Sequence, residues 1–320
     1  MILILGYDND ISSNQVIDWI CIDFMRVNEY DFISQIDITL NESQADLLIT
    51  LNTSIILDSS KIFSYWYRRC DYSFNIQLNT NFTDSKIVKP ILQKEWDTIK
   101  YLIHNKFERN KSFGSSIREA QHNKLYTLLL AQSLGILIPD TLITNSKANL
   151  KAYHDQQNRL ISKSCGGIFR IENNIQFQTI GTQAITMNVI DSLSEFFFPT
   201  FVQKKIEKVY ELRIFYMKNQ FYPMAIFSQN DEKTQLDYRN YNREKPNRNV
   251  PYILPEEIKI KLQLLMDKLD LDSGSIDMIV TPEGEYVFLE VNPTGQFGWV
   301  SENCNYYLEE KIANYLQGES

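Results

Sequence analysis

Apolar and polar residues alternate along the first third of the chain in two different periods. A period of two, or an unbroken apolar run, predicts a strand, and this applies to residues 1–6, 30–40 and 45–51. Helical spacing predicts one helix within 12–25 and another over 90–107. Their apolar faces consist of Val16, Ile17, Ile20 and Phe24 in the first and of Leu92, Trp96, Ile99 and Ile103 in the second. This alternation is typical of an α/β domain with a parallel sheet.

A polar stretch over residues 109–119 follows and reads as a linker. Within it, Ser116 and Glu119 have the spacing of a capping box, so we expect a helix to begin there and to end at Gly135. The chain then continues as strand, helix and strand, over 137–144, 146–158 and 159–164.

From about residue 195 the pattern becomes richer in strands. We expect strands over 200–206, 211–219 and 220–228, helices over 255–270 and 305–316, and a hairpin over 275–293. Residues 230–252 form a long polar and basic segment. A loop of that length in a compact domain is usually functional or disordered.

Composition narrows the class of protein. With 320 residues, of which 43% are hydrophobic and 22% charged, the chain has the make-up of a globular enzyme. Its net charge of −8 argues against non-specific binding of nucleic acid, which needs a basic face. The N-terminus lacks the features of a signal peptide, and no apolar stretch has the length of a membrane span. The four cysteines are widely spaced, so a reduced, cytoplasmic protein is the simplest expectation.

The hairpin over 275–293 is the most informative segment. Asp277 lies in its first strand and Glu290 in its second, with Asn292 two residues further on the same strand. Two carboxylates and an amide oxygen on one surface suit a hard cation such as Mg²⁺. The competing interpretation is a solvated hairpin with scattered acids, but the flanking residues are too apolar for a fully solvated hairpin.

Two further segments have weaker signals. Lys163 ends a strand and precedes a loop with Gly166 and Gly167, whose backbone N–H groups could approach phosphate oxygens, although a plain turn is the more frequent reading. In 201–216, a strand, a basic break and a second strand could offer backbone groups to a purine, with Glu211 on the ribose. The alternative is an edge hairpin with a solvated charged side.

Two arginine-containing stretches complete the candidates. Arg239 in the long polar segment could stabilise charge on a transferring phosphoryl group, although a lone loop arginine is usually a surface residue. In 64–75, two arginines follow three aromatic residues. Stacking on nucleic acid is conceivable there, but the acidic net charge favours a structural or peptide-docking role.

The order of these features resembles the ATP-grasp superfamily. Lys124 comes first, followed by Lys163 with its glycine loop, the segment VQKKI, an arginine pair and finally Asp277 with Glu290-x-Asn292-Pro. The match covers about residues 115–317, and its most specific parts are SIDMIV with FLEVNP and the stretch LGILIPDT after Lys124. The resemblance implies an ATP-grasp fold of α/β and α+β class. It comprises an N-terminal α/β pre-ATP-grasp domain (1–112), a central domain (113–194) and a C-terminal domain (195–320).

A finer resemblance is to the ATP-grasp maturases of graspetides, the microviridin-like ω-ester and ω-amide peptides. The segments WYRR, IFSQ with LDYRNY, NRNVPYILPEEI and FLEVNPTGQFGW look like the flavobacterial type found in grasp-with-spasm systems. This extends the resemblance over nearly the whole chain.

The resemblance implies roles for individual residues. Lys124 and Lys163 would hold ATP phosphates, and the Gly166–Gly167 loop would close over them as a lid, with Cys165 as a spacer. The adenine pocket would consist of Gln203, Lys204, Lys205 and Ile206, with Glu211 near the nucleoside. Arg213 and Arg239 would hold the γ-phosphate and the acyl phosphate, and two Mg²⁺ ions would bind Asp277, Glu290 and Asn292.

The reaction that the resemblance implies is the activation of carboxylates in a ribosomal precursor peptide with a leader and an acidic, Thr-rich core. A Glu or Asp side chain becomes an acyl phosphate, and a Ser or Thr hydroxyl or a Lys amine displaces the phosphate to close a ring. The family also implies a homodimer. One alternative is a ligase for a free amino acid or small peptide, like glutathione synthetase or RimK. The other is a non-catalytic nucleotide-binding or peptide-binding module.

Overall fold

The fold divides into two compact units. It is described from a computed structural model over residues 1–42, 45–75, 85–166, 169–173, 176–229, 244 and 246–318. Unit 1 consists of residues 1–122, 270–275 and 293–320, and unit 2 consists of residues 123–269 and 276–292. The chain therefore leaves unit 1 and returns to it twice.

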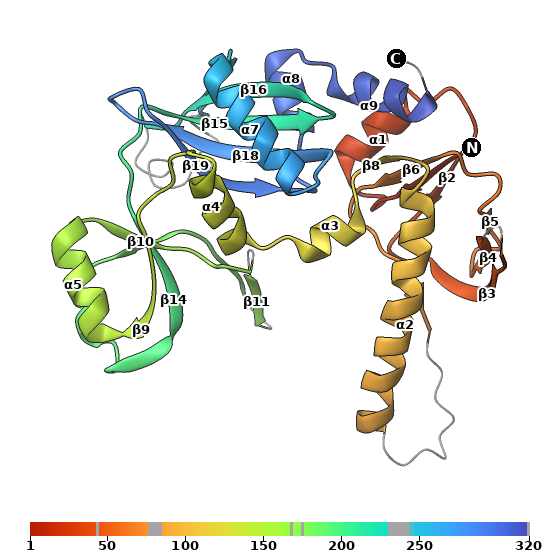
Figure 1. Cartoon of the computed structure of the whole chain (residues 1–320), viewed down its shortest axis with the longest axis horizontal. Helices are drawn as coiled ribbons and strands as arrows, with labels where there is room; N and C mark the ends of the chain where they lie inside the picture. The colour runs from red at the N-terminus through yellow and green to blue at the C-terminus, as the bar shows by residue number, and fades with distance from the viewer. Residues whose placement is uncertain are drawn as a thin grey trace. The chain divides into compact units, whose positions relative to one another are not determined.

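The centre of unit 1 is a four-stranded parallel sheet, as the sequence predicts (Figure 1). Its order is β2 (Phe24–Val27), β1 (Ile2–Leu5), β6 (Ser64–Tyr67) and β8 (Lys111–Phe113). All of β1 and β6 is buried, which explains their unbroken apolar and aromatic sequences. From β1 the chain runs through α1 (Ile11–Ile17) to β2 on one side, and β6 then pairs on the other side of β1. The connections thus reverse direction at β1.

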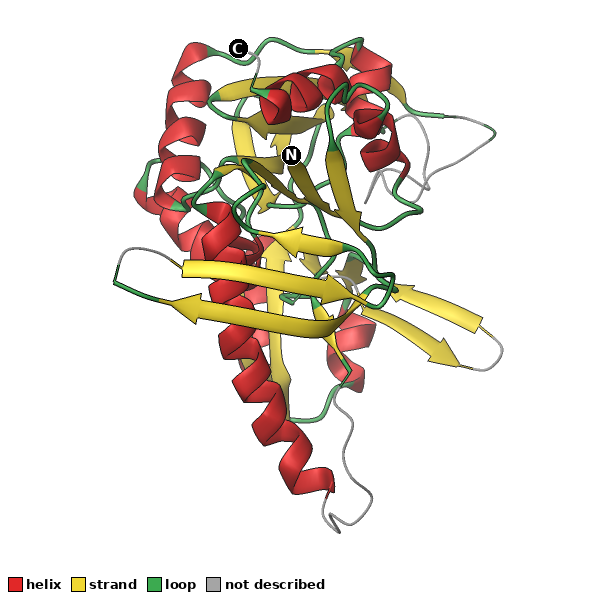
Figure 2. Cartoon of the chain, turned by 90° about the vertical axis from the view of Figure 1, so that its right-hand side faces the viewer, coloured by secondary structure: helices red, strands yellow, loops and turns green. Residues whose placement is uncertain are grey.

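A second sheet and the long helix α2 complete the first third of the chain. The sheet has the order β5 (Ile56–Asp58), β4 (Ala45–Leu51), β3 (Phe32–Leu40) and β7 (Ser73–Phe74). Strands β3 and β4 pair antiparallel and appear in Figure 2 as two long arrows. Helix α2 (Ser85–Glu108) contributes Trp96, Ile103 and Phe107 to the buried core of this region, where Phe107 stacks on Tyr65.

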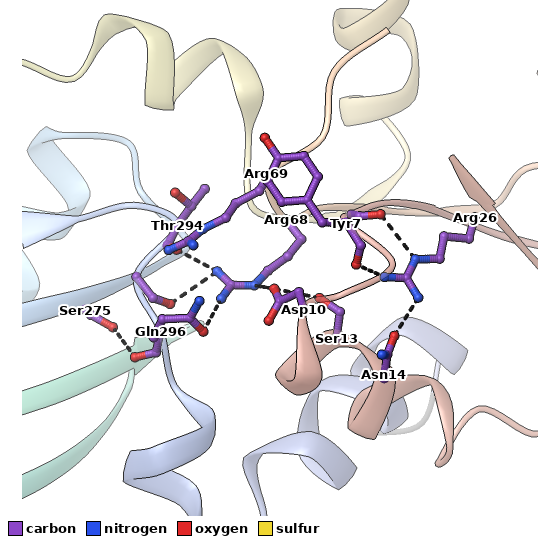
Figure 3. Close-up of polar contacts among 12 residues, drawn as sticks. Tyr7, Asp10, Ser13, Asn14, Arg26, Arg68, Arg69, Ser275, Thr294 and Gln296 are labelled. Carbon is purple, nitrogen blue, oxygen red and sulfur yellow. Dashed lines mark hydrogen bonds and ion pairs between the residues drawn. The ribbon is translucent and has the colours of Figure 1, made fainter. Parts of the chain in front are cut away.

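The C-terminal segment completes unit 1. It contains α8 (Gly298–Cys304) and α9 (Leu308–Gln317), and α9 packs on α1, β6 and β8. The buried guanidinium of Arg68 joins the beginning and the end of the chain (Figure 3). It donates to Asp10 (2.9 Å), to the carbonyl of Thr294 (2.6 Å) and to the side chain of Gln296 (2.8 Å).

The first half of unit 2 is an antiparallel sheet with two helices. Its order is β13 (Gln183–Ile185), β10 (Leu160–Ser162), β14 (Phe196–Lys204) and β9 (Thr141–Ser146). Helix α5 (Lys147–Gln157) lies beside β9 and β14 in Figure 1 and contacts α6 (Met187–Ser192). The buried side chains of Leu150, Leu160, Ile190 and Val202 form its core. The hairpin of β11 (Phe169–Asn173) and β12 (Gln176–Ile180) follows β10.

The second half of unit 2 is a five-stranded sheet. Its order is β17 (Arg248–Pro251), β16 (Gln220–Phe227), β15 (Tyr210–Met217), β18 (Ser273–Val280) and β19 (Tyr286–Asn292). Helix α7 (Glu256–Lys268) buries Leu262, Leu265 and Met266, and α4 (Lys124–Ser133) packs on β19. None of the helices in the described part of the chain has the length and apolar character that crossing a membrane requires.

Two predicted helices differ from those in the structure. The helix expected within 12–25 ends at Ile17, and Phe24 begins strand β2. The helix expected from Ser116 to Gly135 is two helices, α3 (Ser116–Gln121) and α4. The chain breaks between them because the side chain of Asn123 accepts hydrogen bonds from the N–H groups of Leu125 and Tyr126, which caps a new helix. The cap of α3 is Ser115, one residue earlier than the predicted capping box.

Candidate functional site

Strand β15 places Glu211 and Arg213 two residues apart inside unit 2, and both side chains are buried. The carboxylate of Glu211 accepts hydrogen bonds from Lys208 (2.7 Å) and from the hydroxyl of Ser228 (2.8 Å). Burial raises the pKa of Glu211, and the Lys208 ammonium opposes that shift. The sequence did not single out Lys208 or Ser228, although the short spacing from Lys208 to Glu211 was visible.

Arg213 forms a buried ion pair with Asp277. One nitrogen, Nη1, lies 2.9 Å from each carboxylate oxygen of Asp277. The side chains are only 9% and 6% exposed, respectively. Strands β15 and β18 are neighbours in the five-stranded sheet, which explains how residues so far apart in the sequence meet. The fold therefore brings together the predicted phosphate-binding arginine and the first predicted metal ligand.

A second ion pair joins Lys124 to Glu290. The ammonium of Lys124, the first residue of α4, lies 2.6 Å from the Glu290 carboxylate on β19. Both side chains are partly exposed, at 16% and 24%. The Asn123 cap sets where α4 begins, and α4 packs on β19. The local sequence thus fixes the position of this lysine.

The segment predicted to line an adenine pocket connects β14 to β15. Gln203 is buried and donates to the hydroxyl of Thr141 (3.1 Å). The backbone N–H of Lys204 donates to Asp140 and that of Lys205 to Arg159. Ile206 follows, partly buried, before β15 begins. This is the predicted arrangement of strand, break and strand.

Lys163 and the start of the glycine loop follow β10 directly. Cys165 and Gly166 are exposed, and Lys163 is partly buried. Burial raises the pKa of the Cys165 thiol, and the positive charge of Lys124 opposes that shift. The electrostatic influence of Lys124 therefore extends to this loop. The sequence also predicts roles for Gly167 and Arg239, and both lie outside the described residues.

The predicted ligands for Mg²⁺ are distributed over β18 and β19. Asn292 is exposed at the end of β19. Within the described residues, no three His, Cys, Asp or Glu side chains gather in a group that could hold a metal ion. The predicted site instead combines two carboxylates with an amide oxygen, which are hard oxygen ligands of the kind that Mg²⁺ prefers. Each carboxylate already pairs with a cationic side chain, so the chemistry of these ligands suits a cation, and their assignment as the Mg²⁺ site stays a prediction.

Of three comparisons with known proteins, one, with solved structures, found matches. No protein-family model matches the chain, and no curated protein does. Solved structures match over the full length. A RiPP-associated ATP-grasp ligase of Chryseobacterium gregarium, in complex with ADP and a leader and core peptide, has 25% sequence identity and a TM-score of 0.84. The match covers 100% of this chain and 97% of that one.

Two more structures place the fold in context. The macrocyclase MdnC of Microcystis aeruginosa, bound with the precursor peptide MdnA, has 26% identity and a TM-score of 0.78, with 99% of each chain covered. D-alanyl-alanine synthetase A of Vibrio cholerae, with 14% identity and a TM-score of 0.53 over 99% of this chain and 97% of that one, shares the fold alone. The chain therefore has the ATP-grasp fold, and over its full length it is similar to RiPP-associated ligases of that fold.

Proposed function

We propose that this ligase activates Glu or Asp side chains of a ribosomal precursor peptide and closes side-chain esters with Thr or Ser, or amides with Lys. The observation that carries the proposal is the full-length similarity to two ligases whose structures contain their peptides. That similarity favours a precursor peptide over a free amino acid as substrate. ADP in one of the two complexes supports an ADP-forming reaction.

The proposed reaction has two balanced steps. A carboxylate oxygen of the peptide attacks the γ-phosphorus of ATP, and ADP leaves to give an acyl phosphate. A hydroxyl or amine of the same peptide then attacks the acyl carbon, loses its proton and releases phosphate. The enzyme needs no nucleophile of its own, so its contribution is positioning and charge stabilisation.

The described residues suit a reaction in which the enzyme positions the reactants and stabilises their charge. Lys124 and Lys163 would hold phosphate oxygens, and Gln203 to Ile206 and Glu211 would bind the nucleoside. Asp277, Glu290 and Asn292 would hold two Mg²⁺ ions, which neutralise phosphate charge when bound. Since Arg213 and Lys124 pair with these carboxylates, they would share them with the ions or turn toward the phosphates. Arg213 and Arg239 would then stabilise the transferring phosphoryl group.

The proposal extends to the surroundings of the reaction. The partner peptide would have a leader and an acidic, Thr-rich core, and the enzyme would act as a homodimer in the cytoplasm. The support for these points is the family resemblance of the sequence. Size-exclusion chromatography with light scattering tests the dimer directly, since a monomer at all concentrations would contradict it.

Mass spectrometry of a precursor peptide encoded beside the gene tests the activity. With ATP and Mg²⁺, we expect loss of one water mass per ring, and no loss with the Glu290→Ala variant. Glu283→Ala, an exposed carboxylate in the turn of the same hairpin, is the matched control and should retain the reaction. Intact peptide with ADP release on a free amino acid would favour the small-substrate ligase. Ring formation by Glu290→Ala would refute the metal-site assignment.

A further inference from the structure

Unit 1 contains a cavity of about 770 Å³ at the carboxyl ends of β1 and β6. Tyr7 and Asp10 follow β1, Arg69 follows β6, and all three line the cavity. The chain connections reverse direction at β1, and ligands of open parallel sheets bind in the crevice outside the carboxyl ends at such a reversal. The cavity therefore has the location and the size of a binding site.

Aromatic side chains form much of its wall. Trp19, Trp299 and Tyr307 line it, and Trp19 and Tyr307 are 47% and 60% exposed. Large aromatic groups that stay exposed beside a cavity offer apolar surface and a π-face to a ligand. The chain has four tryptophans, and two of them lie here.

The charges on the wall are mostly negative. Asp18, Glu302 and Glu309 line the cavity and form no ion pair with any described residue, although Glu309 accepts a hydrogen bond from the hydroxyl of Ser301. Asp10 is neutralised by Arg68 at 2.9 Å. Arg69 is the only cation among the described lining residues. It donates through Nε and Nη2 to the carbonyl of Thr294, which holds its guanidinium against residues 294–296 (Figure 3).

A buried hydroxyl also faces the cavity. Ser12 lines it, is 8% exposed, and forms no hydrogen bond through its hydroxyl within the described residues. Gly298 makes room for this hydroxyl, because a Cβ added there would lie 2.5 Å from Ser12 Oγ. This hydroxyl is therefore available to bond to a group in the cavity.

We propose that this cavity binds a Lys or Arg side chain of the precursor peptide. Carboxylates that form no ion pair with a described residue, Asp18 and Glu302 above all, would supply the charge, and the tryptophan faces would supply cation–π contacts and cover the aliphatic stem. The proposal rests on the proposed function for the identity of the ligand. It assigns unit 1 a role in holding the peptide that is separate from the nucleotide residues of unit 2.

Tryptophan emission during peptide titration tests the proposal. The probes are acetylated, amidated pentapeptides Gly-Thr-Xaa-Leu-Gly with Lys, Gln or Glu as Xaa, added to the full chain without ATP or Mg²⁺. We expect a saturable change with the Lys peptide, about tenfold weaker binding of the Gln peptide, and weakening by added salt. The Asp18→Asn/Glu302→Gln variant should lose most of this preference, and Trp19→Phe should lose much of the signal.

The control and the contrary outcomes are distinct. Glu95→Gln removes an exposed carboxylate of unit 1 outside the cavity and should bind like the parent. Three outcomes would each overturn the proposal. The Lys and Gln peptides could bind equally, or the Lys peptide could fail to saturate. The Glu peptide could also bind more tightly, with Arg69→Gln abolishing that binding. Because ATP and Mg²⁺ are absent, this result is independent of whether the ligase reaction occurs.

Discussion

At the scale of single residues, Arg213 and Asp277 form a buried charge pair in the candidate site. Both side chains lie below 10% exposure, so each charge depends on the other for stabilisation. We expect Arg213→Met to lower the free energy of unfolding by about 3–5 kcal/mol, because it removes the Arg213 cation from the buried Asp277 carboxylate. Urea unfolding followed by circular dichroism measures this.

The double variant provides the internal control. Arg213→Met/Asp277→Leu should be more stable than Arg213→Met alone, since it removes both charges and no unpaired carboxylate remains. If the two variants are equally stable, the pair does not carry the interaction that its geometry indicates.

Cys165 allows a chemical test of the nucleotide site. It is exposed beside Lys163, and Cys21 is an exposed cysteine of unit 1. Burial raises the pKa of the Cys304 thiol to about 11, so that thiol stays protonated and unreactive near neutral pH. We expect iodoacetamide at pH 8 to label Cys21 and Cys165 first. ATP with Mg²⁺ should slow labelling of Cys165 alone, as peptide mass mapping would detect. Equal protection of Cys21, or none of Cys165, would contradict the placement.

Glu211 predicts a pH dependence of stability. Burial raises the folded-state pKa of Glu211 above the ordinary 4.5. The stability that Glu211 contributes is therefore fully present below pH 4.5, and it declines as pH rises through the raised pKa. The stability of the parent relative to Glu211→Gln should therefore fall as pH rises through this window. Urea unfolding over a pH series measures the difference, and a rise with pH would be the wrong sign.

At this scale the sequence identified the charged residues well but not their partners. The sequence predicted four charged site residues that the structure joins in two ion pairs, Arg213 with Asp277 and Lys124 with Glu290. The pairing depends on strand order and on the contact between α4 and β19, neither of which local patterns contain.

At the scale of elements, the break between α3 and α4 has the clearest physical cause. The amide oxygen of Asn123 accepts from two backbone N–H groups at 3.0 Å and starts α4 at Lys124. We expect Asn123→Ala to cost about 1 kcal/mol of stability and to weaken ATP binding, because the start of α4 positions Lys124. Thermal unfolding and a nucleotide-binding titration measure the two effects.

The conservative variant separates capping from other roles. Asn123→Asp retains a capping oxygen and should keep most of the stability. If Asn123→Asp is as damaging as Asn123→Ala, the side chain acts through something other than the cap.

The hydrophobic periodicity predicted most helices and strands, and it failed where polar side chains decide the end of a helix. Strands at 30–40 and 45–51 and the helix at 90–107 were expected and are found as β3, β4 and α2. Helix α8 was not expected, because Gly298 and the short run after it have no strong helical pattern. The early end of α1 was also missed, since the apolar residues beyond Ile17 continue the helical spacing.

At the scale of the whole molecule, Arg68 joins segments that lie 226 residues apart in sequence. All four tryptophans, Trp19, Trp66, Trp96 and Trp299, lie in unit 1, so tryptophan emission reports this unit alone. We expect Arg68→Met to destabilise unit 1 by about 3–5 kcal/mol, because Asp10 and the carbonyl of Thr294 lose their buried cation. Urea unfolding followed by tryptophan emission measures this.

Arg69→Met is the matched comparison. Arg69 is less buried, and among the described residues its side chain bonds only to the carbonyl of Thr294, so its removal should cost clearly less. Equal losses would mean that the Arg68 cluster is not what holds the two ends of unit 1 together.

Whole-molecule organisation was predictable only in part. The order of motifs led to the ATP-grasp fold, and the full-length structural matches bear this out. The division into domains at 112 and 194 stays a prediction. The return of residues 270–275 and 293–320 to unit 1 could not be read from the chain, because long-range closure leaves no local periodicity.

The discontinuity of unit 1 has a consequence for synthesis on the ribosome. N-terminal domains usually fold first, while the rest of the chain is still being made. Here the sheet emerges first, but Thr294, which bonds to Arg68, is translated 226 residues after it, and helices α8 and α9 follow. The packing of the early strands therefore stays incomplete until residues 293–317 have been made, and we expect the nascent chain to expose apolar surface during that interval.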